Sequence, residues 1–76
     1  MIEFDLPSEA PVAIRIFNIQ GRLVRELVDS PRYEAGVHRI GWDARNDFGL
    51  PVGTGVYFYR FTTKGYQDSR KVVLLR

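Results

Sequence analysis

Few side chains in this sequence are of the types that perform nucleophilic or metal chemistry. There is one histidine, His38, and no cysteine, which excludes a thiolate nucleophile, a disulfide and a conventional zinc site. Ser8, Ser30 and Ser69 lie outside any G-x-S-x-G motif, and nothing places them beside a base oriented by a carboxylate. We therefore predict that the protein is not an enzyme, and that His38 is a half-covered strand residue beside Trp42.

A small group of oxygen-bearing side chains offers the one candidate metal site. Asp43, Asn46 and Asp47 could bind calcium, but their spacing is not that of an EF-hand loop and Arg45 lies among them. The favoured interpretation is a set of turns, in which Asp and Asn side chains accept hydrogen bonds from nearby backbone amides. Calcium binding by this loop stays open from the sequence, and no other metal or cofactor is predicted.

The charge pattern and the apolar runs argue against two classes of partner. Eleven basic and nine acidic residues leave a net charge of +2, and the basic residues are scattered among acids, so no nucleic-acid partner is predicted. The segment 53–55 lacks the G-K-[ST] continuation of a phosphate-binding loop. The longest apolar runs are about four residues, far below the length that spans a bilayer, so no membrane insertion is predicted.

Any functional side chain must be positioned by strands, because apolar and polar residues alternate along most of the chain. Such alternation is typical of half-buried strands. The six segments that show it span residues 2–6, 12–18, 22–29, 37–43, 56–63 and 70–75. Segment 22–29 also fits a short helix, but Gly21 and Pro31 leave it barely two turns. We predict a strand there, with an irregularity near Arg25 and Glu26.

The order of these segments predicts an all-β fold. A chain of 76 residues has room for one hydrophobic core, so residues 1–76 are expected to form a single domain. Short strands separated by turn residues are typical of an antiparallel sandwich. We expect a small immunoglobulin-like or fibronectin-III-like β-sandwich of six to seven strands, with loops over 30–36 and 44–55. Its core would contain the inward residues of the first two strands, Ile2, Phe4, Leu6, Val12, Ile14 and Ile16.

Several motifs follow one another in an order that resembles a known family. They are FDLP (4–7), V-x-I-x-I-F-N-x-x-G-R-L-V-R-E-L (12–27), A-G-V-H-R-I-G-W-D (35–43), N-D-F-G-L-P-V-G-T-G-V-Y-F-Y-R (46–60) and R-K-V-V-L-L-R (70–76). In order and spacing they resemble the FlgD-like immunoglobulin-type domain, and they are similar to the C-terminal sorting domains of type IX secretion cargo. The family often has glycine after its Trp-Asp pair, where this chain has Ala44.

Five residues within these motifs are expected to define the fold. Gly21 and Gly36 would serve turns, where glycine supplies a positive φ. Trp42 would fill the core. Gly55 would let the chain enter the strand that contains Tyr57.

The resemblance implies a non-catalytic C-terminal module of an exported multidomain bacterial protein, acting in sorting, secretion or surface attachment. Because no signal peptide precedes the first strand, we expect the module to reach the extracellular space or cell surface within a longer chain. Its expected partners are neighbouring domains of that chain and either the secretion machinery or a cell-surface component. The residues of the expected recognition strip are Arg70, Lys71, Val73, Leu75 and Arg76.

Two other functions remain open from the sequence. The module could be a structural spacer or assembly domain that docks on a neighbouring domain or subunit through Phe17 and Phe58. It could also bind carbohydrate, because exposed aromatic side chains in a row stack on sugars. That function would require side chains such as Phe58, Tyr33 and Tyr66 to form one exposed, flat row.

Overall fold

The computed structural model describes residues 2–75, and the elements it contains there are six strands. They are β1 (Ile2–Leu6), β2 (Ala10–Asn18), β3 (Leu23–Tyr33), β4 (Gly36–Ile40), β5 (Gly55–Thr63) and β6 (Tyr66–Leu74). All pairings are antiparallel, so the predicted all-β fold is confirmed. Within the described residues, no helix is long and apolar enough to span a membrane.

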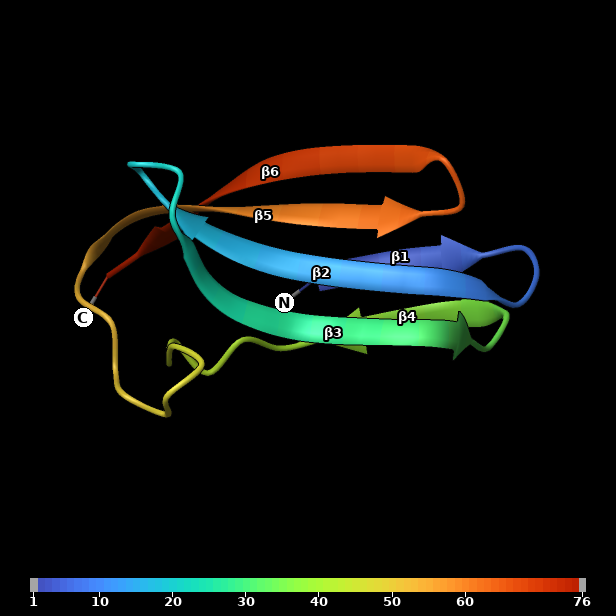
Figure 1. Cartoon of the computed structure of the whole chain (residues 1–76), viewed down its shortest axis with the longest axis horizontal. Helices are drawn as coiled ribbons and strands as arrows, with labels where there is room; N and C mark the ends of the chain where they lie inside the picture. Colours follow the sequence, from blue (N-terminus) through green and yellow to red (C-terminus); the bar gives the residue numbers. More distant parts are fainter. Residues whose placement is uncertain (1, 76) are drawn as a thin grey trace.

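The strands form two sheets of unequal size. One sheet has four strands in the order β3-β2-β5-β6, and the other has two, β1 and β4. Figure 1 shows β1 and β4 lying behind β2 and β3. Strands β5 and β6 continue the larger sheet on the other side of β2, where the smaller sheet does not lie behind them. The arrangement is a small immunoglobulin-like sandwich, in which β2 and β5 are the two central strands of the larger sheet.

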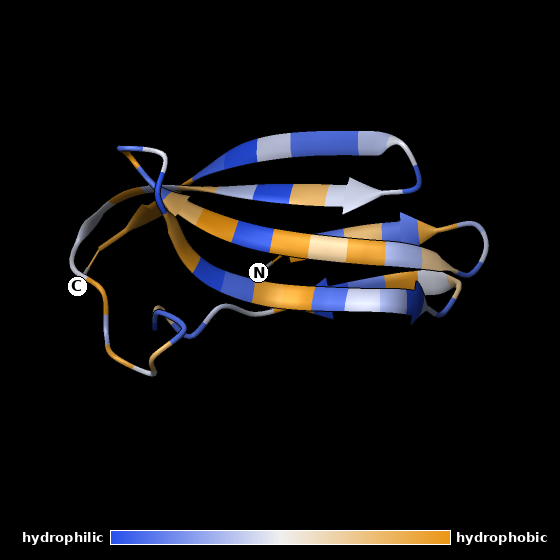
Figure 2. Ribbon diagram, in the orientation of Figure 1, coloured by the Kyte–Doolittle hydropathy of each residue, from blue (hydrophilic) through white to orange (hydrophobic). Residues whose placement is uncertain are grey.

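The hydrophobic core lies between the two sheets. Val12, Ile14 and Ile16 alternate along β2 and are 2 %, 0 % and 0 % exposed. Ile2 and Leu6 of β1 face them and are also buried. The inward pattern predicted for the first two strands is therefore confirmed. Figure 2 shows hydrophobic residues along β2, whereas most of β6 is hydrophilic, as expected for a strand at the edge of the sheet.

Strand β3 is longer and more irregular than a simple hairpin partner. Its pairing with β2 shifts register three times, and each shift inserts an extra residue on the β3 side. Two of the shifts flank Arg25 and Glu26, where an irregularity was predicted. The loop predicted over 30–36 was wrong for residues 30–33, which continue β3. Pro31 is tolerated there because β3 is an edge strand and needs no second set of ladder hydrogen bonds.

The largest other differences from the predicted strand boundaries are in β4 and β6, and β2 begins at Ala10 rather than Val12. Strand β4 ends at Ile40, so residues 41–43 belong to the long loop that follows. Strand β6 begins at Tyr66 rather than Arg70, because the turn at Lys64 and Gly65 holds β5 and β6 in continuous register. Both turn residues have positive φ, as a tight hairpin requires.

Candidate functional site

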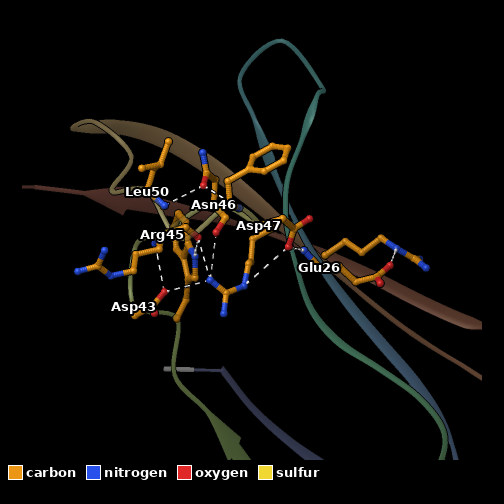
Figure 3. Close-up of polar contacts among 10 residues, drawn as sticks. Glu26, Asp43, Arg45, Asn46, Asp47 and Leu50 are labelled. Carbon is orange, nitrogen blue, oxygen red and sulfur yellow. Dashed lines mark hydrogen bonds and ion pairs between the residues drawn. The ribbon is translucent and has the colours of Figure 1, made fainter.

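The long loop between β4 and β5 is organised around the guanidinium group of Arg25. Arg25 Nη1 donates to Asp43 Oδ1 at 3.4 Å and to the carbonyl oxygens of Arg45 and Asn46 at 3.3 and 3.4 Å. Its Nε lies 3.9 Å from Asp47 Oδ1. Figure 3 shows Asp47 beside Glu26 of β3, with the other labelled loop residues farther from that strand residue. The loop is thereby held against the irregular part of β3.

The same contacts occupy the oxygen atoms that calcium would need. Asp43 Oδ1 also accepts the backbone N–H of Arg45 at 3.1 Å, and Asp47 Oδ1 accepts that of Glu26 at 2.9 Å. Asn46 Oδ1 accepts two backbone N–H groups within the loop. The interpretation of these residues as turn-forming side chains is confirmed, and the Arg25 guanidinium lies beside the carboxylates of Asp43 and Asp47.

Replacing Arg25 by alanine should loosen this loop. Asp43 and two carbonyls would lose a hydrogen-bond donor and Asp47 a nearby cation, so we expect the free energy of unfolding to fall by about 1–2 kcal/mol. Urea denaturation of both proteins measures the change. The matched control is Arg15→Ala, which removes only the partly exposed pair with Glu26 and should cost less than about 1 kcal/mol. Equal losses in the two variants would contradict the account of Arg25.

The single histidine lies in an aromatic cluster rather than in a catalytic group. His38 is half-buried, as predicted, but its ring neighbours are Phe4 and Tyr33, with centroids at 5.3 and 4.6 Å, rather than Trp42. His38 Nε2 hydrogen-bonds the carbonyl oxygen of Glu34 at 2.7 Å. Within residues 2–75, no group of three or more metal-binding side chains is present.

The residues of the proposed docking face lie side by side on the outer surface of the four-stranded sheet. Phe17 and Phe58 are direct cross-strand partners, and Lys71 pairs with Phe58 in the same row. Arg60 places its guanidinium carbon 4.8 Å from the centre of the Phe17 ring. Phe58 keeps 38 % of its surface exposed. The face is therefore apolar at its centre, with cations beside it.

The structure divides the expected recognition strip between two surfaces. Lys71 and Val73 lie on the outer face of β6, where Val73 is 56 % exposed, and Leu75, which is 79 % exposed, follows the strand's last residue, Leu74. Arg70 points to the inner face, because neighbouring residues of a strand point to opposite sides. Arg76 lies outside the described residues. The free edge of β6 runs along Arg70, Lys71 and Val73.

Arg70 forms an ion pair with Asp68, a residue of its own strand. Its Nε donates to Asp68 Oδ2 at 3.1 Å, and this hydrogen bond together with the Asp68 charge raises the pKa of Arg70 above its ordinary value. Both side chains lie on the inner side of β6, next to Tyr59 and Phe61. Arg70 is thus assigned to a different surface from the outer strip.

Four of the five expected fold-defining residues fall at the ends of strands or in the connections between them, and Tyr57 lies within β5. Gly21 (φ 82°) and Gly36 (φ 122°) have positive φ, one in the β2–β3 turn and the other at the start of β4. Trp42 is half-buried outside the central core, where it contacts the Tyr57 ring edge-on at 5.4 Å and donates its indole N–H to Arg45 O. Gly55 begins β5.

Ala44 also occupies a left-handed conformation, at φ 60°. The family that the sequence motifs resemble often has glycine at this position. Glycine adopts this conformation without the steric cost that a Cβ carries, so the backbone supplies a physical reason for that preference.

The exposed aromatic residues do not form a single platform within residues 2–75. Phe58 is on the outer face, Tyr66 begins β6 on the inner side, and Phe48 is in the long loop, 87 % exposed. Tyr33 packs against Phe4 beside the core. A row of rings for stacking on a sugar chain is therefore not formed, and the carbohydrate alternative gains no support.

Sequence reasoning missed two features of these surfaces. The role of Arg25 was hidden because its partners lie about twenty positions later in the chain. A groove of about 630 Å³ between β1 and the inner side of β5 and β6 was also missed. The sequence feature that could have indicated this groove is the pair of polar residues, Asp68 and Arg70, at positions of β6 that face inward.

A comparison with protein-family models supplies an independent finding. The model described as "FlgD Ig-like domain" matches residues 1–68, which is most of the chain. No match was found among curated proteins or among solved structures.

Proposed function

Because this chain belongs to the FlgD Ig-like domain family, we propose that it is a non-catalytic module of an exported multidomain bacterial protein, where it acts in sorting, secretion or surface attachment. Its partners would be neighbouring domains of the parent chain and either the secretion machinery or a cell-surface component. Its location would be extracellular or at the cell surface.

The observation that carries this proposal is the free edge of β6. That strand is last in the order β3-β2-β5-β6, so one row of its backbone N–H and C=O groups has no partner strand within residues 2–75. Lys71 and Val73 stand beside this edge, Leu75 follows its last residue, and all three are exposed. A partner strand could add there, with affinity from backbone hydrogen bonds and selectivity from the basic and apolar side chains.

The test is an export assay on a signal-peptide-bearing reporter in a host with type IX secretion. Residues 1–76 are fused to the reporter's C-terminus, and the fraction that crosses the outer membrane is measured with and without them. We expect export only with the module attached. Retention of the folded fusion in the periplasm would contradict the sorting role.

Charge reversal locates the signal within the module. Lys71→Glu should reduce the exported fraction at least several-fold, because it replaces the positive charge beside the β6 edge with a negative one. The substitution leaves the core intact, since Lys71 is on the outer face. Arg22→Glu is the matched control, since it makes the same charge change in the exposed β2–β3 turn and should leave export unchanged. Equal export by Lys71→Glu and the unsubstituted module would exclude the strip as the signal.

A second function, docking on a neighbouring domain, is favoured by the juxtaposed Phe17 and Phe58 on the outer face. In the same export series, Phe58→Ser distinguishes the two functions. Docking predicts normal export of this variant but a lower thermal midpoint of the module within its parent chain. In the isolated module the midpoint should fall less, because there the substitution removes only the cross-strand pair with Phe17.

A further inference from the structure

The smaller sheet covers only part of the larger one. Strands β1 and β4 lie behind β2 and β3 in Figure 1, while β5 and β6 extend beyond them. Immunoglobulin sandwiches commonly contain seven strands, divided between sheets of four and three. Here the described residues form sheets of four and two, so the second layer is one strand short beside β1.

The uncovered area is a groove with two walls. One wall is the full length of β1, and the other consists of alternate, inward-facing residues of β5 and β6. Its volume is about 630 Å³. The aromatic part of the second wall comprises Tyr59, Phe61 and Tyr66, of which Tyr66 is 57 % exposed. Such a surface is apolar enough to bury side chains of an added layer.

Strand β1 also has an unused hydrogen-bonding edge on the groove side. It pairs with β4 through residues Ile2 to Leu6, and no described strand pairs with its other edge. Unpaired strand edges readily accept another strand. The groove therefore combines a backbone template with an apolar wall, whereas the free edge of β6 has no second sheet beside it.

The charges in the groove indicate which strand would fit. Asp68 and Arg70 face the groove from the inner side of β6, whereas Glu3 and Asp5 alternate with the inward residues of β1, so their carboxylates lie on the outer side of the smaller sheet, beside the same free edge. Glu3 is bound to Arg39 at 2.6 Å and Asp68 to Arg70 at 3.1 Å. Asp5 is exposed and has no ion pair within residues 2–75. An arriving strand with a basic residue would pair with Asp5, whereas an acidic strand would be repelled.

We propose that this groove binds an extended peptide strand, which pairs with β1 and becomes the third strand of the smaller sheet. Its alternate side chains are apolar and pack on Tyr59 and Phe61, and the intervening ones are basic and lie beside Glu3 and Asp5 on the outer side of the smaller sheet. This surface is separate from the outer strip on β6, so it adds a second interaction to the proposed function.

The test is an NMR titration of the ¹⁵N-labelled 76-residue chain with a synthetic peptide, acetyl-KVKVTV-amide. A peptide of the same composition in scrambled order, acetyl-KKTVVV-amide, is the control. We expect the alternating peptide to shift and protect the amides of β1 and to shift the inner residues of β5 and β6. The scrambled peptide should leave them unchanged.

Charge reversal makes the test specific to the groove. Asp5→Lys should weaken binding of the alternating peptide at least tenfold, and the exposed Glu34→Lys should leave it unchanged. The proposal is overturned if β1 does not respond at millimolar peptide, if the scrambled peptide acts equally, or if the shifts map to β6. Concentration-dependent protection of β1 without peptide would also overturn it, because a second copy of the chain would then occupy the groove.

Discussion

Substituting Ile14 by alanine should destabilise this module more than substituting Arg25 or Gly36. Ile14 is 0 % exposed in the centre of β2, where it packs with Val12, Ile2 and Leu6 between the two sheets. Removing three buried carbons costs the transfer free energy of those atoms and leaves a cavity that a rigid sheet cannot close. We expect a loss of about 2–5 kcal/mol in the free energy of unfolding.

Urea denaturation followed by circular dichroism measures this loss. Because a 76-residue domain has a small reserve of stability, Ile14→Ala could leave no folded baseline, so Ile14→Val is measured beside it. That variant should lose about 0.5–1.5 kcal/mol. The control is Val73→Ala on the exposed outer face, expected to change stability by less than about 0.5 kcal/mol. Equal losses at positions 14 and 73 would contradict the placement of the core.

Substituting Gly36 by alanine should have the second largest effect, for a reason confined to the backbone. Gly36 begins β4 with a φ of 122°, a region that residues with a Cβ rarely enter. A Cβ there would meet no atom within 4 Å, so the cost is conformational and not a clash with a neighbour. We expect destabilisation by about 1–3 kcal/mol.

The matched control for Gly36→Ala is Gly53→Ala. A Cβ on Gly53 also meets nothing within 4 Å, but the backbone there is not at positive φ. Alanine should be neutral at this position or stabilise by up to about 1 kcal/mol, because it restricts the unfolded chain. Thermal unfolding of both variants is the measurement. If Gly53→Ala were the more damaging change, the connection between β3 and β4 would be wrongly described.

The sequence was sufficient to predict the strands that form the core. Alternation is strong along β1 and β2, where the inward residues are buried or, at Phe4 and Asn18, partly buried, because one face of each strand meets the opposite sheet. Strand boundaries were less predictable. Proline at position 31 signals a loop locally, yet an edge strand accommodates it, and which strand is an edge depends on the whole topology.

The functional surfaces were only partly predictable, because they depend on register. Phe17 and Phe58 were expected on one face, and the pairing of β2 with β5 places them opposite each other. The strip on β6 was expected to include Arg70, but the pleat turns that residue inward beside Asp68. The groove beside β1 arises from the different numbers of strands in the two sheets, which local sequence does not encode.

The central claim is that this module interacts through unpaired strand edges on a stable two-sheet core. Native-state amide hydrogen exchange, followed by NMR on the 76-residue chain, tests that claim most directly. Consecutive amides of β2 and β5 should be strongly protected, since both strands are paired on both sides. In β1 and β6, alternate amides should exchange quickly, because those N–H groups point away from the single partner strand. Uniform protection along β1 or β6 would contradict the account.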